Sequence, residues 1–242
     1  MYYTDQLIVP NYLCDMHDRI SIWSTARLFQ EAADHHVKTL NVGFRQLIAQ
    51  GKAWVLSRMY YDVSRLPAED QQVTVRTWSR GTDGLFAFRE FQLIDAQGVA
   101  VSCTSYWVII DLNTRHVLRM HDLIDGFETH PDLATDHPQL DRLRIPRQAP
   151  QPLISASFPV RPSMLDHTNH VNNTEYIKWI FDHLPEPYAS RTSYRFGIEF
   201  QLETQPSETV SLYSYIPDTP DTDPAYFKIN NSRSTAVIAF LS

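Results

Sequence analysis

Two helix-forming segments, each followed by a run of strand-forming segments, constrain the fold of this chain most strongly. The first helix starts near a capping hydroxyl, Ser24 or Thr25, and carries apolar residues at four-residue steps up to Leu40. The second follows Asn172 and presents one broad apolar face over residues 176–184. Because the same order of elements occurs twice, the sequence predicts a tandem duplication of one helix-plus-sheet unit.

The first half is predicted to contain a long helix, a shorter helix and at least four strands. Turn residues such as Ala96-Gln97-Gly98 separate the later strands, which favours hairpin connections and antiparallel pairing. The expected elements are a short strand over residues 6–9, helices over 24–40 and 44–50, and strands over 53–63, 73–79, 85–94 and 99–111.

A polar stretch that is rich in proline separates the two halves, and this composition is typical of a crossing linker. We therefore expect an N-terminal domain over residues 1–128, a linker over 129–152 and a C-terminal domain over 153–242. In the second half, strands are expected over residues 154–160, 194–202, 209–216, 225–229 and 236–241.

The two copies can be aligned residue by residue, although weakly. Placing Asp18 on Asp166 puts Ser24 on Asn172, and residues 72–78 match residues 209–215 in alternation. This alignment sets Ile22 opposite His170. The asymmetry fits a protein in which the second copy carries out chemistry and the first copy holds substrate.

The loop before the second helix carries the side chains best suited to catalysis. It reads Asp166-His167-Thr168-Asn169-His170-Val171-Asn172-Asn173, and loops held by a rigid element are where chemistry tends to be placed. Glu175, three residues after Asn172, completes a pattern close to a capping box. The alternative is that Asp166 and His170 only satisfy donors of the turn and the helix cap.

Composition argues against several classes of protein. The formal net charge of -7, without a basic stripe, argues against a nucleic-acid partner. No apolar run approaches the roughly 18 residues needed to span a bilayer, and the N-terminus lacks the pattern of a signal peptide. The two cysteines, Cys14 and Cys103, fit a reducing cytoplasm. Metal-ligand spacing is absent from the sequence, so we expect neither a metal nor another cofactor.

The order of these segments resembles the hot-dog thioesterases, and most closely the acyl-acyl-carrier-protein (acyl-ACP) thioesterase family of bacteria and plant chloroplasts. The resemblance covers nearly the whole chain and implies an α+β fold, a tandem (double) hot-dog of two helix-plus-antiparallel-sheet units. The segments that carry it are SIWSTARLFQEAADHH, AWVLSRMYYDVSRLP, VTVRTWSRG, SYWVIIDLNTR, LDHTNHVNNTEYIKW and EFQLETQPSETVSLYSY.

The resemblance also implies catalytic residues. The family's loop reads Asp-x-Asn-x-His-Val-Asn-Asn, and a glutamate lies on the strand that follows the helix, so Asp166, His170 and Glu203 match. The family's asparagine falls on Thr168, whose hydroxyl cannot reproduce the geometry of an amide. Asn169 would take that role if the loop were shifted by one residue.

Several routes to thioester hydrolysis remain open from these residues. Glu203 or Asp166 could activate a water while His170 positions it or shuttles the proton, or Asp166 could attack directly through an anhydride. Thr204 stands where plant members carry a cysteine, so no thiol nucleophile is expected there. Backbone N–H groups at the start of the second helix would hold the oxyanion. Activated water is our working hypothesis.

Substrate binding is assigned to both halves. The acyl chain is expected between the first helix and the first long strand. On that strand Trp54 and Leu56 share one face and Met59 lies on the other because strand side chains alternate, and the sequence leaves open which face is turned toward the helix. Asn169 and Asn173 are the candidates in the catalytic loop. Arginines at positions 142, 144 and 147 are expected to form a solvated face, with docking of an acidic carrier protein as the alternative.

The function expected from the resemblance is hydrolysis of long- or medium-chain fatty acyl-ACP, which releases free fatty acid and ends elongation. The alternatives are an acyl-CoA thioesterase, or a non-hydrolytic or dehydratase-like acyl-binding protein, which the Thr168 departure keeps open. The expected partner is an acyl carrier protein bearing a fatty acyl chain. A homodimer is among the expected assembly states.

Overall fold

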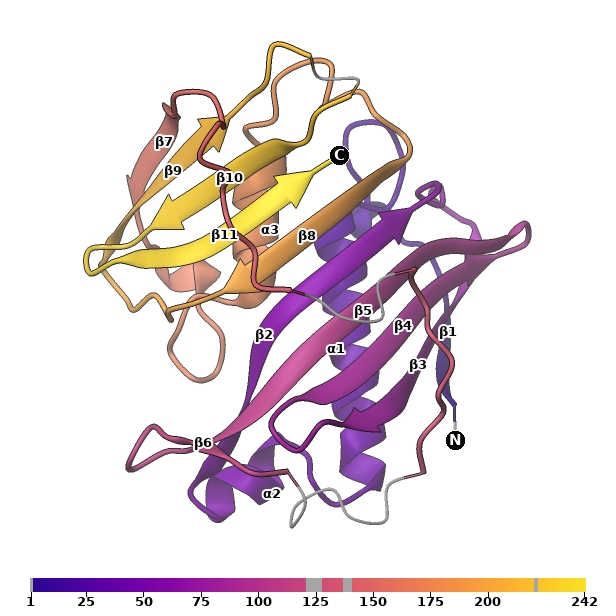
Figure 1. Ribbon diagram of the computed structural model, residues 1–242. Helices are drawn as coiled ribbons and strands as arrows, with labels where there is room; N and C mark the ends of the chain where they lie inside the picture. The colour runs from indigo at the N-terminus through magenta and orange to yellow at the C-terminus, as the bar shows by residue number, and fades with distance from the viewer. Residues whose placement is uncertain (1, 121–127, 137–140, 220–221) are drawn as a thin grey trace. The chain divides into compact units, whose positions relative to one another are not determined.

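The computed structural model describes residues 2–120, 128–136, 141–219 and 222–242. The chain divides into two compact units, Met1–Leu140 and Asp141–Ser242. Each unit combines helix with an antiparallel sheet (Figure 1), which confirms the predicted repeat of one helix-plus-sheet plan. Of the helices that the structure describes, none is both long enough and apolar enough to cross a lipid bilayer.

The strands of the N-terminal unit pair antiparallel in the order β1-β3-β4-β5-β2, and the short β6 pairs with β5. The strands β3, β4 and β5 follow one another directly, as the predicted hairpins require. The elements are β1 (Tyr3–Ile8), the 3-10 turn η1 (Asn11–Leu13), α1 (Ile22–Thr39), α2 (Phe44–Ala49), β2 (Lys52–Val63), β3 (Gln72–Thr82), β4 (Ala87–Asp95), β5 (Gly98–Asp111) and β6 (Val117–Leu118).

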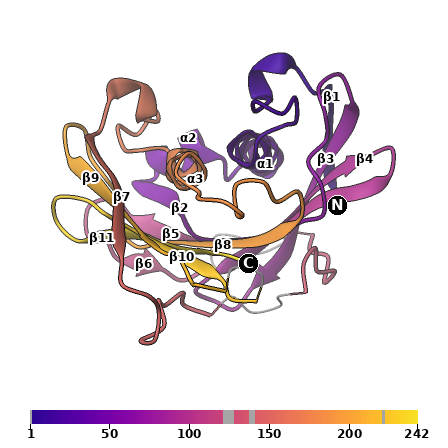
Figure 2. The ribbon, with the colours of Figure 1, turned by 90° about the horizontal axis from the view of Figure 1, so that it is seen from above.

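The strands of the C-terminal unit pair antiparallel in the order β8-β11-β10-β9-β7. Figure 2 looks along its helix, α3, with the sheet of this unit curving around it. The elements are β7 (Leu153–Pro159), the 3-10 turn η2 (Pro162–Met164), α3 (Asn173–Phe181), β8 (Tyr194–Phe200), β9 (Thr209–Tyr215), β10 (Ala225–Asn230) and β11 (Thr235–Leu241).

Helix α1 packs on its sheet through an apolar face. Phe29 stacks on Phe91 of β4 and on Tyr61 of β2, with ring centroids 5.0 and 6.3 Å apart, and all three rings are buried. Ala26 and Ala33 lie on the same buried side of the helix and allow a close approach to the sheet. Burying each large apolar side chain contributes about 1.5–3 kcal/mol, so this contact holds the helix in place.

Both long helices start at a capped residue, but only one start was predicted correctly. The side chain of Asn172 accepts a hydrogen bond from the N–H of Thr174 at 2.9 Å, as expected for the N-cap of α3. The cap of α1 is Ser21, whose Oγ accepts from the N–H of Ser24, instead of the predicted Ser24 or Thr25. Several hydroxyl residues within one turn are equally good caps by type, so the sequence could not choose among them.

The duplication is therefore present, but its predicted alignment is wrong. The backbone N–H of Asp15 donates to the carbonyl of Arg19 at 2.7 Å, just as that of Asp166 donates to the carbonyl of His170 at 2.8 Å. Asp15 and Arg19, not Asp18 and Ile22, are thus the counterparts of Asp166 and His170. The error amounts to nearly one helical turn, which preserves the apolar periodicity that guided the alignment.

A β-bulge at Ser57 changes which side chains of β2 share a face. The register of β2 against β5 shifts there, so Leu56 lies opposite Trp107 while Met59 lies opposite Ser105. Those two partners are two residues apart on β5 and lie on the same side of it. Leu56 and Met59 therefore share a face, contrary to the prediction, because strict alternation holds only where no residue is inserted.

That shared face is the one turned toward α1. Ser105 also lies opposite Arg89 of β4, and the buried Arg89 guanidinium contacts Nδ1 of His36 on α1 at 3.0 Å. Burial, together with the charge of Arg89, lowers the pKa of His36 to about 4, so this histidine is neutral. Trp54 and Leu56 consequently face the helix, whereas Val55 points away and is 37% exposed.

Candidate active site

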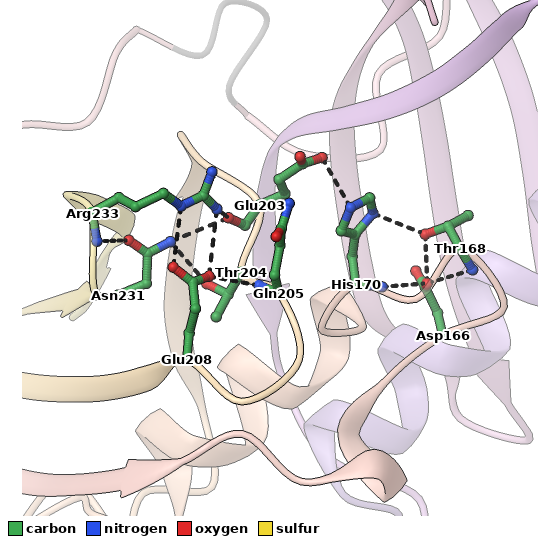
Figure 3. Close-up of polar contacts among 9 residues, drawn as sticks. All are labelled: Asp166, Thr168, His170, Glu203, Thr204, Gln205, Glu208, Asn231 and Arg233. Carbon is green, nitrogen blue, oxygen red and sulfur yellow. Dashed lines mark hydrogen bonds and ion pairs between the residues drawn. The ribbon is translucent and has the colours of Figure 1, made fainter.

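The carboxylate of Asp166 shapes the loop that precedes α3. Its Oδ1 accepts hydrogen bonds from the N–H of Thr168 at 2.8 Å, from the Thr168 hydroxyl at 2.5 Å and from the N–H of His170 at 3.3 Å (Figure 3). Asn169 takes a left-handed conformation with φ of 64°, which asparagine tolerates better than most residues. The loop is therefore folded around a single side chain.

His170 lies between Thr168 and Glu203. Its Nδ1 is 3.2 Å from the Thr168 hydroxyl, and its Nε2 is 3.4 Å from Oε2 of Glu203. The side chains of His170 and Glu203 are 26% and 31% exposed, so both are partly buried and still reachable by a substrate. Asp166, Thr168, His170 and Glu203 form one connected row of polar groups (Figure 3).

The row determines which ring nitrogen of His170 carries hydrogen. A hydroxyl has one hydrogen, and the short contact with a carboxylate places the Thr168 hydrogen on the side of Asp166. The Thr168 oxygen can then only accept from His170, so Nδ1 must be protonated. Nε2 faces the Glu203 carboxylate at 3.4 Å, and because an ionised carboxylate can only accept, this contact is favourable when Nε2 carries a hydrogen as well.

Thr168 thus lies between Asp166 and His170. The sequence alone did not decide whether Thr168 or Asn169 would take this position. The side chain of Asn169 is exposed and has no hydrogen bond among the contacts of the described residues. Asn173 is the first residue of α3 and is half-buried. Neither asparagine belongs to the row of polar groups, so their expected role in substrate binding stays a prediction.

Glu203 does not lie on a strand, as the resemblance implied, because β8 ends at Phe200. The glutamate belongs to the connection from β8 to β9. Its neighbour Thr204 is fully buried and accepts a hydrogen bond from Asn231 Nδ2 at 3.3 Å, so it points away from solvent. Asn231 and Arg233, which contact this segment, were not identified from the sequence because they follow β10 with no motif around them.

Other nucleophiles and bases near the two helices fit catalysis poorly. Burial raises the pKa of Cys103 well above its ordinary value, and burial with nearby carboxylates raises that of Cys14. Burial also raises the pKa of Tyr176 on α3 to about 12, so its phenol stays protonated. Across the described ranges, the His, Cys, Asp and Glu side chains form no group of three that could hold a metal ion.

The two substrate-binding candidates of the first unit, Trp54 and Leu56, lie on β2. The indole Nε1 of Trp54 donates to the carbonyl of Val42 at 3.0 Å, and its ring packs beside the buried Leu47 and Ile109. Leu56 is buried on the helix-facing side of the sheet. Both residues are held by the protein's own core, and their part in binding an acyl chain stays a prediction.

Two family models match the chain. The acyl-ACP thioesterase N-terminal domain matches residues 1–126, and the acyl-ACP thioesterase C-terminal domain matches residues 148–239. Together they cover both units, including the loop with Asp166 and His170 and the segment with Glu203.

Curated plant proteins are similar in sequence. The chloroplastic oleoyl-acyl carrier protein thioesterase 2 of Arabidopsis thaliana is 28% identical over 224 residues, which cover 86% of this chain and 61% of the relative. The chloroplastic dodecanoyl-[acyl-carrier-protein] hydrolase of Umbellularia californica is 26% identical over 198 residues, covering 76% of this chain and 51% of the relative. The chain thus spans between half and about three fifths of these relatives' length.

Solved structures share the fold. An acyl-ACP thioesterase from Bacteroides thetaiotaomicron matches with a TM-score of 0.85 at 20% identity, covering 99% of this chain and 96% of that one. The 12:0-ACP thioesterase from Umbellularia californica matches with a TM-score of 0.84 at 20% identity, covering 100% of this chain and 96% of that one. At such identities the likeness is one of fold, and it confirms the predicted tandem hot-dog.

Proposed function

This chain belongs to the acyl-ACP thioesterase family, and we propose that it hydrolyses the thioester of long- or medium-chain fatty acyl-ACP. The products are a free fatty acid and the thiol of the carrier protein. The observation that carries the proposal is the connected row of Asp166, Thr168, His170 and Glu203. It combines an oriented imidazole with a partly exposed carboxylate, which is what hydrolysis by an activated water requires.

We assign the role of base to Glu203. Its carboxylate removes a proton from water, and the resulting hydroxide adds to the thioester carbonyl. His170, with its Nδ1–H directed at Thr168, donates the Nε2 proton to the departing thiolate when the tetrahedral intermediate collapses. Transfer of the proton on Glu203 back to Nε2, 3.4 Å away, restores the starting state and balances the reaction.

Asp166 is better suited to orientation than to attack. One of its carboxylate oxygens already accepts three hydrogen bonds, each of which withdraws electron density and fixes the group within the loop. Direct attack to form an anhydride would break these bonds at the moment of reaction. We therefore favour the activated-water route over the anhydride route.

The developing oxyanion needs hydrogen-bond donors, and the start of α3 offers them. The first backbone N–H groups of a helix have no partner within the helix, and the positive end of the helix dipole favours negative charge. Asn173 is the first residue of α3. We assign its backbone N–H to the oxyanion and leave its side chain to contact the substrate together with Asn169.

The N-terminal unit, expected over residues 1–128, is assigned to the acyl chain. Its sheet turns Trp54 and Leu56 toward α1. This face is apolar and packs against apolar side chains of the protein, so it can also pack against an alkyl chain. Each buried methylene contributes about 0.8 kcal/mol, so a chain of matching length gains affinity without any polar contact.

The carrier protein is assigned to the linker side of the C-terminal unit. Arg144 and Arg147 are exposed there, and a local basic surface would let an acidic enzyme bind an acidic carrier. Arg142 is less available, because its Nε lies 3.3 Å from a carboxylate oxygen of Glu199. The two free thiols, Cys14 and Cys103, support a reducing compartment such as the cytoplasm.

The purified protein should release free thiol and fatty acid from acyl-ACP without added metal. Glu203→Gln and His170→Ala should each lower kcat by about 10²-fold or more, the scale for losing a general acid or base. Cys14→Ser and Cys103→Ser are the controls and should stay close to wild type. Absence of thiol release at every acyl-chain length, or loss of turnover in a folded serine variant, would contradict the proposal.

Thr168 is predicted to act through its hydroxyl. Thr168→Val removes the hydroxyl at nearly constant volume and should lower kcat by about tenfold or more, whereas Thr168→Ser should retain most of it. Asn169→Ala should matter less than Thr168→Val. Steady-state kinetics of the three variants decide between the residues, and the reverse ranking would mean that Asn169 provides the missing polar group.

Bulk on the helix-facing side of β2 is predicted to shorten the preferred acyl chain. Leu56→Trp fills space against α1 and should shift the preference toward shorter chains, because a steric clash excludes methylenes outright. Val55→Trp is the matched control, since Val55 points away from α1. Profiles over a series of acyl-ACP lengths measure the effect. No shift in Leu56→Trp, with a shift from added bulk at Phe200 or Leu202, would move the acyl chain to the C-terminal unit.

A further inference from the structure

The turn between β10 and β11 contacts the backbone of Glu203. Asn231 is buried, and its Nδ2 donates to the carbonyl oxygen of Glu203 at 3.1 Å and to the Thr204 hydroxyl at 3.3 Å. Its Oδ1 accepts from the N–H groups of Arg233 and Ser234 at 2.9 and 3.0 Å. The Asn231 amide therefore joins the turn to the segment that carries the proposed base (Figure 3).

Arg233 adds a second connection from the same turn. Its Nη2 donates to the carbonyl oxygen of Glu203, and its Nε lies 3.1 Å from Oε1 of Glu208. Glu208 in turn accepts a hydrogen bond from the N–H of Gln205 at 2.7 Å through Oε2. Arg233 and Glu208 thus hold this segment at two backbone groups, the carbonyl of Glu203 and the N–H of Gln205.

The segment needs such contacts because the sheet does not hold it. The pairing of β8 with β11 ends at Phe200, and β9 starts at Thr209, so Glu203 lies between the two ladders. On its other side, the carbonyl of Thr204 accepts a hydrogen bond from the N–H of Val171 at 2.9 Å. Val171 follows His170, so displacement of this segment would alter the distance between the Glu203 carboxylate and the imidazole.

We propose that Asn231 and Arg233 are positioning residues for thioester hydrolysis, which they support by holding the Glu203 backbone. The inference rests on the proposed function, because it assigns their role through the base of that reaction. Both side chains hold Glu203 through its backbone carbonyl oxygen. Their loss should therefore change kcat and leave KM nearly unaltered, since the acyl and carrier contacts lie elsewhere.

A double-mutant cycle tests this proposal. Arg233→Gln should lower kcat for acyl-ACP by about tenfold with KM within about twofold, because small displacements of a catalytic group are costly. In the Glu203→Gln background, the same change should lower the residual kcat little or not at all, since the group being positioned is gone. Arg233→Lys, which can still donate to the Glu203 carbonyl, should recover part of the loss.

The matched control is Arg65→Gln in the other unit. Arg65 also binds a carboxylate and a backbone carbonyl, those of Asp95 and Gly98, but it belongs to the other compact unit. Its loss should leave kcat unchanged. If Arg233→Gln melts below the assay temperature, Asn231→Ser carries the same cycle at the other contact with the Glu203 carbonyl.

The outcomes separate the two proposals. A wild-type protein that releases no thiol from any acyl-ACP overturns the proposed function itself. If the wild type is active, two results overturn the positioning role alone. In one, folded Arg233→Gln keeps full kcat; in the other, Arg233→Gln lowers kcat by the same factor in the wild-type and Glu203→Gln backgrounds. An effect on KM alone would also overturn it and would assign the turn to substrate binding.

Discussion

The carboxylate of Asp166 is the group on which the candidate active site depends. Its Oδ1 gathers two backbone N–H groups and one hydroxyl, and this folds the loop so that Thr168 lies beside the imidazole of His170. Because the Thr168 hydrogen is directed at Asp166, the imidazole must donate through Nδ1. The opposite nitrogen then faces Glu203, and the roles that we propose for the groups in the row depend on this one arrangement.

The N-terminal copy builds the same loop with different side chains. Asp15 accepts from the N–H groups of His17 and Arg19 at 2.8 and 3.3 Å, as Asp166 does from Thr168 and His170. Asp18 takes the left-handed conformation with φ of 56°, in the place of Asn169. The backbone frame is thus common to both copies. The side chains at the positions of Thr168 and His170 are His17 and Arg19, which is why we propose the catalytic residues in the C-terminal copy.

Much of the fold could be predicted because hydrophobic periodicity and turn residues determine the type and order of elements. Features that depend on a single inserted or competing residue could not be predicted. They are the cap of α1 at Ser21, the bulge at Ser57 and the alignment of the two copies. In the site, Asp166, His170 and Glu203 could be matched by pattern. The hydroxyl bridge of Thr168 and the contacts of Asn231 could not, because they exist only when distant segments meet.

Nitrogen-15 NMR of the His170 ring tests the central claim most directly. The account predicts that Nδ1 carries a proton wherever the protein is folded and Asp166 is ionised, because the Thr168 oxygen can only accept from it. Thr168→Val should remove this constraint, so that Nδ1 no longer has to carry a proton. A bare Nδ1 with a protonated Nε2 in the wild-type protein would contradict the row of hydrogen bonds on which the proposed mechanism rests.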